Sequence, residues 1–192
     1  MACAADQAIR IAVLGDSLTA GYGLAEEHSF PAQLEKRLAE KGKNVTVINA
    51  GISGDTTAGG LARLDWMLKS SPDLVIIELG GNDALRGLDP NITKQNLEYI
   101  LQRLQKENVS ALLAGMRAPR NLGKGYYTKF DALYPELAAT YHVPLYPFFL
   151  EGVAGDPDLN LADGIHPNRD GYRVIVRNII PYLTEMIETL ER

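Results

Sequence analysis

The chain has 192 residues, of which 46% are hydrophobic and 22% are charged, and its formal net charge is −5. This length suits one globular domain, and the composition is that of an ordinary soluble protein. A nucleic acid or an anionic membrane as partner calls for a basic patch, and the scattered Lys and Arg residues indicate none. The sequence also lacks a run of about 18 apolar residues, so we expect no stable insertion into a membrane.

The first residues, Met1-Ala2-Cys3-Ala4-Ala5, allow two interpretations. We predict that residues 1–8 form a flexible N-terminal segment. It is either a signal-peptide remnant, because the spacing of Ala2 and Ala4 is typical of a cleavage site, or a stretch added to the natural chain. Cys3 is the only cysteine, which excludes an intrachain disulfide and a cysteine-based zinc site. We therefore predict a single domain over residues 9–192.

Short apolar runs recur along the chain and predict strands. They are almost entirely apolar rather than alternating, which is typical of strands covered on both faces in a parallel sheet. The runs span residues 9–14, 45–48, 74–79, 111–114 and 143–146.

Segments with helical spacing of apolar residues separate these runs. The first begins after Ser29, a predicted N-cap, and the last has an apolar stripe over 172–190. Pro181 lies inside that stripe, so we expect a kink or a break there. The alternation of strands and helices predicts an α/β fold, a three-layer α/β/α sandwich around a parallel sheet of about five strands. The other helical segments lie around 61–68, 97–104 and 126–141.

Two motifs far apart in the sequence supply the side chains of a serine-hydrolase triad. Ser17, in Gly15-Asp16-Ser17-Leu18, follows the first apolar run, although a lone serine there is also explained as a helix cap. In Asp163-Gly164-Ile165-His166-Pro167 an acid precedes a histidine by three residues, a spacing that the other two histidines lack. We predict Ser17 as nucleophile, His166 as general base and Asp163 as the acid that orients the imidazole.

Glycine-rich polar turns follow the second and third runs, and they predict an oxyanion hole. The turns are Asn49-Ala50-Gly51-Ile52-Ser53-Gly54-Asp55 and Gly80-Gly81-Asn82-Asp83. Since parallel strands end at one edge of their sheet, both turns should lie beside Ser17. The backbone N–H groups of Ser17 and Gly51 and the side-chain amide of Asn82 are the predicted donors.

Other polar residues near these turns receive structural interpretations. Asp16 and Asp83 are predicted to brace loops, because a site for a hard cation requires a denser set of carboxylates, and no metal is expected. Tyr22 is predicted to be a packing residue, as are Tyr126 and Tyr127. Arg117 and Arg120 either meet an anionic leaving group or are solvated.

The acyl group of a substrate should lie against apolar side chains near the nucleophile and along the irregular segment 115–125. An apolar surface discriminates one methylene by only ~1–3 kcal/mol, so broad specificity is expected. The predicted substrate-binding residues are Leu18, Leu85, Leu88, Met116, Ala118 and Pro119.

Taken together, these motifs resemble the blocks of the SGNH (GDSL) hydrolase superfamily, with Ser17, Gly51, Asn82 and His166 at its name-giving positions. The chain is most similar to the bacterial branch of thioesterase I, lysophospholipase and arylesterase enzymes. The resemblance implies a flavodoxin-like fold, the same triad and oxyanion hole, no cofactor and a monomer. It also implies a periplasmic or secreted protein, with a cytoplasmic location left open.

We therefore expect a serine esterase that hydrolyses short- to medium-chain carboxylic esters and aryl esters through an acyl-enzyme. Some thioesterase and lysophospholipase activity is expected as well, with a small ester or thioester as the partner. A carbohydrate O-deacetylase with the same triad is the alternative within hydrolases. A nucleotide- or phosphate-binding flavodoxin-like module is the alternative outside enzymes, although the sequence has neither a P-loop nor a Gly-x-Gly-x-x-Gly fingerprint after a strand.

Overall fold

The computed structural model describes residues 8–191, with a parallel five-stranded sheet at its centre. The strand order is β2-β1-β3-β4-β5, which confirms the predicted parallel sheet. Each strand lies at one of the apolar runs. The strands are β1 (Ile9–Gly15), β2 (Val45–Gly51), β3 (Leu74–Glu78), β4 (Ser110–Ala114) and β5 (Leu145–Tyr146).

Burial along the sheet explains why its central strands are uniformly apolar. All five residues of β3 are buried, because β3 lies between β1 and β4 and is covered on both faces. β2 lies at one edge and is partly exposed along most of its length. β5, at the other edge, has only two residues, and it pairs with β4 through Leu145–Leu113 and Tyr146–Ala114.

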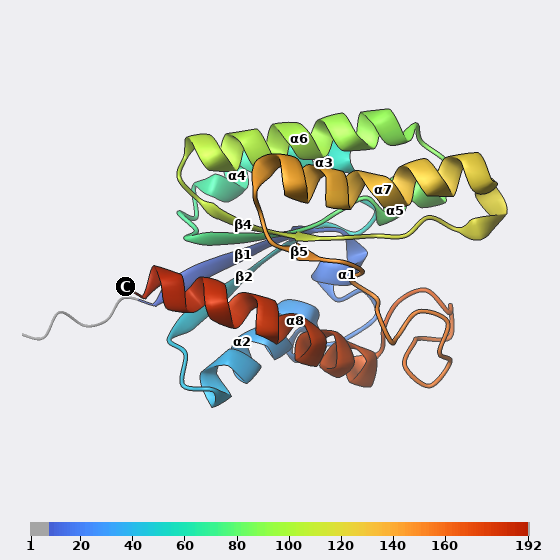
Figure 1. Cartoon of the computed structure of the whole chain (residues 1–192). Coiled ribbons are helices and arrows are strands. Elements are labelled where there is room, and N and C mark those ends of the chain that lie inside the picture. Colours follow the sequence, from blue (N-terminus) through green and yellow to red (C-terminus); the bar gives the residue numbers. More distant parts are fainter. Residues whose placement is uncertain (1–7, 192) are drawn as a thin grey trace, which may run out of the picture.

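Helices cover both faces of the sheet and give the predicted three layers (Figure 1). α2 (Phe30–Glu40) and α8 (Arg169–Leu190) pack together on one face. α3 (Thr57–Ala62), α6 (Pro90–Lys106) and α7 (Lys124–Tyr141) pack on the other. The shorter elements are the helices α1 (Ser17–Ala20), α4 (Leu64–Leu68) and α5 (Gly81–Leu85) and the 3-10 turns η1 (Glu26–His28) and η2 (Arg120–Leu122).

The helices follow the sequence patterns with two differences. Ser29 caps α2 as predicted, since its hydroxyl accepts the N–H of Ala32 at 3.4 Å. The predicted helix around 61–68 is two short helices, α3 and α4, separated at Arg63.

Of the kink or break expected at Pro181, the break is wrong, because α8 continues through this residue. Pro181 and Arg177, whose carbonyl loses its usual helical donor, are both exposed. Water can therefore bond that carbonyl, which lowers the cost of an internal proline. Across residues 8–191, no helix is both long and apolar enough to cross a membrane.

Candidate active site

The predicted triad residues lie within hydrogen-bond distance of one another. His166 Nε2 lies 2.9 Å from Ser17 Oγ, and His166 Nδ1 lies 2.7 Å from Asp163 Oδ2. Ser17 is the first residue of α1, directly after β1, whereas the other two lie on the loop before α8. The predicted convergence of the two motifs at one edge of the sheet is confirmed.

Asp163 is held in the ionised form by the turn that follows it. Its Oδ1 accepts the backbone N–H groups of His166 at 3.0 Å and Ile165 at 2.9 Å. These bonds, first the one from His166, and the bond to the imidazole lower the pKa of Asp163 to about 2. The carboxylate therefore stays negative over the pH range of an ordinary hydrolase and favours the tautomer of His166 with a proton on Nδ1.

Ser17 is fixed by contacts beneath it. The Asp16 carboxylate caps α1 by accepting the N–H of Leu18 at 2.9 Å. Thr19 Oγ1 donates to Glu78 Oε2 at 2.7 Å, and a side chain at Gly15 would collide with both of these groups. Glycine at this position therefore lets β1, α1 and the end of β3 approach closely.

Two carboxyl groups are buried below Ser17, and their pKa values are raised whereas that of Asp163 is lowered. Burial raises the pKa of Asp16 to about 6, and burial together with the charge of Asp16 raises the pKa of Glu78 well above 4.5. Glu78 is entirely buried, and its Oε1 has no hydrogen-bond partner among the described residues. A proton on Glu78 relieves the repulsion between these neighbours.

Two of the predicted oxyanion donors already have acceptors within the protein. Asn82 Nδ2 donates to Asp16 Oδ2 and to the Asp55 carbonyl, each at 2.9 Å. The N–H of Gly51 donates to Asn49 Oδ1 at 3.0 Å. An oxyanion must therefore compete with these acceptors for the donors. Gly51 also has a packing role, because a side chain there would collide with the backbone of α1.

A cavity of about 650 Å³ opens beside the triad. Its lining includes Ser17, His166 and Asn82 together with several apolar side chains. Five predicted substrate-binding residues line it, namely Leu18, Leu85, Met116, Ala118 and Pro119, joined by Phe148, Leu150 and Ile165, which the sequence analysis missed.

Leu88, the sixth predicted substrate-binding residue, is not among the described residues that line this cavity. The chain turns at Gly87, which has a φ of 64°. The Tyr126 hydroxyl donates to the Leu88 carbonyl at 2.8 Å and ties this segment to α7.

Both arginines of the cavity wall already have partners. Arg117 lies over the ring of Phe148 at 4.5 Å and pairs with Glu151 at 3.5 Å. Arg120 lies over the Tyr127 ring at 4.4 Å and pairs with a carboxylate of α7, Asp131, at 2.7 Å. Their charges are thus partly offset before any substrate binds.

The predicted bracing role of Asp83 is confirmed by three bonds. It accepts the N–H and the hydroxyl of Thr57 at 2.9 and 2.5 Å and the hydroxyl of Thr93 at 3.1 Å. Asp16 braces α1 in the same way. Within residues 8–191 no group of three or more His, Cys, Asp or Glu side chains could hold a metal ion.

The packing role predicted for Tyr22 is confirmed, and its ring packs on His166 with 4.5 Å between the centroids. Two further residues near the site were missed. Arg63 donates to the carbonyls of Ala50 at 2.7 Å and Gly15 at 2.8 Å, which ties together the ends of β2 and β1. The role of Glu78 could have been suspected from the sequence, because Glu78 is a charged residue inside the apolar run 74–79.

Comparison with known proteins agrees with this geometry. The profile of the GDSL-like Lipase/Acylhydrolase family matches residues 13–174, which include the whole triad. The chain belongs to this family. A GDSL hydrolase of this kind is a carboxylic ester hydrolase, which leaves the nucleotide-binding alternative without support.

Similar GDSL hydrolases are known from several bacteria. Esterase TesA of Pseudomonas aeruginosa is 44% identical over 176 residues, or 91% of this chain and 88% of that protein. Thioesterase 1/protease 1/lysophospholipase L1 of Escherichia coli K12 is 48% identical over 159 residues, or 82% of this chain and 75% of that protein. A crystal structure of TesA matches with a TM-score of 0.86 at 44% identity, over 91% of this chain and 97% of that one.

Proposed function

We propose that this protein hydrolyses short- to medium-chain carboxylic esters and aryl esters through an acyl-enzyme on Ser17. The observation that carries the proposal is the hydrogen bond of 2.9 Å between Ser17 Oγ and His166 Nε2 at the wall of an apolar cavity. A serine hydroxyl is a weak nucleophile until a base accepts its proton, and this contact supplies the base.

The proposed reaction has two steps, acylation and deacylation of Ser17, with His166 transferring a proton in each. Ser17 Oγ attacks the ester carbonyl carbon and gives its proton to His166 Nε2, while Asp163 stabilises the resulting imidazolium. The imidazolium then protonates the departing alcohol oxygen, and the acyl group remains on Ser17. A water molecule attacks the acyl-enzyme, gives a proton to His166, and releases the acid as Ser17 regains its proton.

The tetrahedral intermediates require donors for their oxyanion, and we propose Ser17 N, Gly51 N and Asn82 Nδ2. Asn82 lines the cavity, and one of its two protein acceptors is the uncharged carbonyl of Asp55. Turning that N–H toward a full negative charge exchanges a neutral acceptor for a stronger one. Asp16 keeps its own bond and so holds the amide in place.

The cavity supports a broad range of acyl groups. Apolar walls give no hydrogen bond that would distinguish one chain length from the next, so selectivity rests on small transfer energies. Relatives are named esterase, arylesterase and thioesterase 1/protease 1/lysophospholipase L1. We therefore include thioesters and lysophospholipids as secondary substrates of the same site.

A phosphonate ester tests the proposal directly. A p-nitrophenyl alkylphosphonate should add one covalent mass to Ser17, located by peptide mass spectrometry, and should abolish the hydrolysis of p-nitrophenyl butyrate. The Ser17→Ala variant should take up no label and should lose turnover. Activity that survives in this variant, or a label on another residue, would sink the proposal.

An acyl-chain series separates this function from the O-deacetylase alternative. We expect kcat/KM for p-nitrophenyl esters to rise from acetate through butyrate to octanoate, because a longer chain covers more of the apolar wall. A marked preference for acetate, together with release of acetate from acetylated xylan, would favour the deacetylase.

Two expectations about the natural setting remain proposals. We propose that the protein acts outside the cytoplasm and as a monomer, as its resemblance to the thioesterase I branch suggests. The predicted signal-peptide remnant lies outside the described residues. Fractionation of the native host tests the location, and light scattering coupled to gel filtration tests the oligomeric state.

A further inference from the structure

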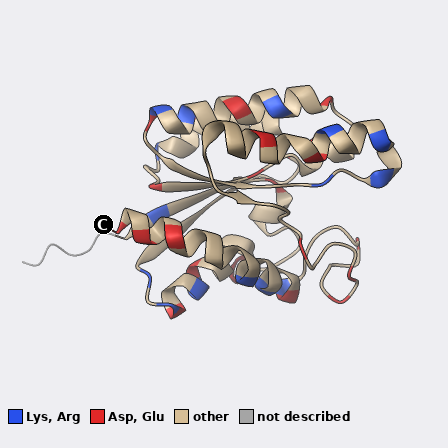
Figure 2. Ribbon diagram, viewed as in Figure 1, with Lys and Arg blue, Asp and Glu red and all other residues tan. Residues whose placement is uncertain are grey.

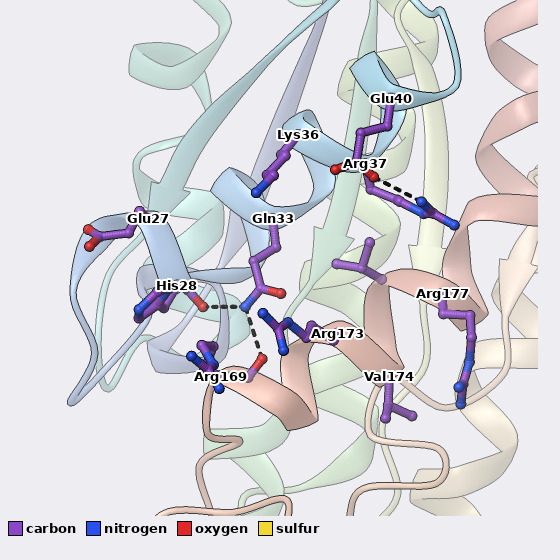
Figure 3. A pocket seen from close by; sticks show the side chains of 11 residues that line it. Glu27, His28, Gln33, Lys36, Arg37, Glu40, Arg169, Arg173, Val174 and Arg177 are labelled. Atoms are coloured by element: carbon purple, nitrogen blue, oxygen red, sulfur yellow. Dashed lines mark hydrogen bonds and ion pairs between the residues drawn. The ribbon is translucent and has the colours of Figure 1, made fainter.

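A second cavity, of about 540 Å³, lies between α2 and α8 on the face opposite to α6 and α7. Figure 3 shows the side chains that line it, with Gln33 of α2 bonded to the backbone at the start of α8. The groove is lined by Glu27, His28, Gln33, Lys36, Arg37, Glu40, Arg169, Arg173, Val174, Val176 and Arg177.

The lining of this groove is rich in cations, although the protein as a whole carries a charge of −5. The sequence analysis saw no basic patch, because the residues come from two helices far apart in the chain. The packing of α2 on α8 brings them together, and Figure 2 shows Lys and Arg residues on both of these helices. The cations are Lys36, Arg37, Arg169, Arg173 and Arg177, against Glu27 and Glu40.

The arginines of α8 are placed against the usual preferences of a helix. Arg169, Arg173 and Arg177 follow one another at intervals of four residues, so like charges are neighbours on one face. Arg169 also lies in the first turn, where the helix dipole favours anions. Asp170 offsets part of this charge, with bonds of 3.3 Å to Arg169 and 2.8 Å to Arg173. Arg177 and Lys36 form no ion pair with any described residue.

The groove begins close to the triad. Arg169 is three residues after His166, so their Cα atoms are within about 11 Å of each other. Gln33 Nε2 donates to the carbonyls of His28 at 2.8 Å and Arg169 at 3.1 Å, which fixes this end of the groove. From Arg169 the basic row extends a further ~12 Å along α8 to Arg177.

We propose that this groove binds the phosphate groups of a leaving group whose thioester lies at Ser17, as in an acyl-coenzyme A. The inference rests on the proposed function, in which thioesters are secondary substrates. Arginine guanidinium groups bind phosphate oxygens in a fork, and the groove offers three on one helix face. Arg177 and Lys36 have no ion pair with a described residue, whereas Arg117 and Arg120 beside the acyl cavity each have a carboxylate and an aromatic ring as partners.

Two thioesters with the same acyl group test the proposal. Octanoyl-coenzyme A and octanoyl-pantetheine differ in the leaving group, and only the former carries phosphates. In a double variant, Arg173→Gln with Arg177→Gln, we expect the KM for octanoyl-coenzyme A to rise roughly 5- to 10-fold, as two screened charge contacts allow. Its kcat, and both constants for octanoyl-pantetheine, should stay unchanged.

A charge-matched control isolates the groove from the overall field. Lys106→Gln with Lys129→Gln removes two exposed cations from α6 and α7 on the other face of the sheet and should leave the KM unchanged. An equal rise in this control, or a rise for octanoyl-pantetheine as well, would overturn the proposal. So would a selective effect that appears only with Arg117→Gln and Arg120→Gln.

Binding and inhibition provide readouts that do not need thioester turnover. Coenzyme A should bind the Ser17→Ala protein, with an affinity lowered roughly 5- to 10-fold by the double Arg variant and by added salt. Coenzyme A binding that is unchanged in the double variant would contradict the leaving-group assignment.

Inhibition by ADP is the second readout. ADP should compete with octanoyl-coenzyme A but not with octanoyl-pantetheine. Equal inhibition of both substrates would indicate a site for a free phosphorylated effector and would also contradict the leaving-group assignment. If no ester at all is hydrolysed, the proposed function fails, and the binding measurement alone decides on the groove.

Discussion

Ser17, the proposed nucleophile, lies between two groups of carboxylates that behave in opposite ways. On the loop before α8, Asp163 receives backbone N–H groups from its own turn, and its pKa falls to about 2. Below the serine, burial raises the pKa of Asp16 to about 6 and that of Glu78 well above its ordinary range. The same chemical group is thus kept charged on one side of Ser17 and favours a proton on the other. The pKa values differ because backbone N–H groups stabilise the charge of Asp163, whereas Asp16 and Glu78 are buried away from water.

The largest effect is expected from Asp163→Asn, which replaces the carboxylate that stays charged. The amide keeps the size of the side chain but no longer fixes the tautomer of His166, so kcat for p-nitrophenyl butyrate should fall by roughly 10³- to 10⁴-fold. The melting temperature should change little, because Asp163 is exposed. Asp158→Asn, an exposed acid of the same loop, serves as the control and should retain activity. A loss of less than tenfold would remove Asp163 from the triad.

The hydrogen-bond partner of Asp16 in the cavity wall is tested by Asn82→Ala. Asn82 bonds to Asp16 and lines the cavity, so its loss should remove an oxyanion donor and lower kcat by roughly 10²- to 10³-fold, or about 3 kcal/mol. The KM should change much less, because the donor acts on the intermediate. Asn91→Ala, at an exposed position in the first turn of α6, is the control. An unchanged kcat would show that Asn82 is only an architectural residue.

The raised pKa of Glu78 is tested by the pH dependence of stability. A carboxyl whose pKa is raised on folding binds its proton more tightly in the folded state, so the free energy of unfolding falls as pH rises above 4.5. The slope contributed by Glu78 is at most about 1.4 kcal/mol per pH unit. In Glu78→Gln this contribution is absent, and the decline measured by urea denaturation between pH 5 and pH 8 should be shallower.

The comparison for that measurement is Glu26→Gln, which removes an exposed carboxylate of η1. Its stability should follow the wild-type curve. If Glu78→Gln also follows that curve, the carboxyl of Glu78 is ionised in the folded protein, and the contrast with Asp163 is lost.

The smallest expected effect concerns Tyr22, which contacts the triad from the solvent side. Removing the ring in Tyr22→Ala should lower kcat/KM by roughly 2- to 10-fold, since ring contacts of this kind contribute about 0.5–1.5 kcal/mol. Tyr22→Phe keeps the ring and should behave as wild type. Tyr99→Ala is a matched control, because Tyr22 and Tyr99 are both 51% exposed. A large loss in Tyr22→Phe would instead assign a role to the hydroxyl.

The sequence predicted the part of the site that is built by local contacts. Asp163 and His166 are close in the chain, and Ser17 and Asn82 follow apolar runs whose ends must meet at one edge of a parallel sheet. The strands, their parallel arrangement and the main helices were predicted for the same reason, since periodicity reports burial.

What the sequence could not show depends on packing between distant segments. The contacts of Glu78 with Thr19 and Asp16, and of Tyr22 with His166, arise from how elements stack rather than from spacing. Leu88 is absent from the cavity lining, and it follows a positive φ at Gly87 that the sequence analysis did not anticipate. The basic groove was missed because its two helices are separated by more than a hundred residues.

The edge strand β5 has a consequence for how the molecule meets other copies of itself. With only Leu145 and Tyr146 in the strand, this margin of the sheet offers a foreign chain very few free backbone groups to pair with. Short margins of this kind are one way in which natural proteins avoid joining sheet to sheet and forming fibrils. Lengthening β5 by redesigning residues 147–149 as a regular strand should therefore increase aggregation even if catalysis is preserved.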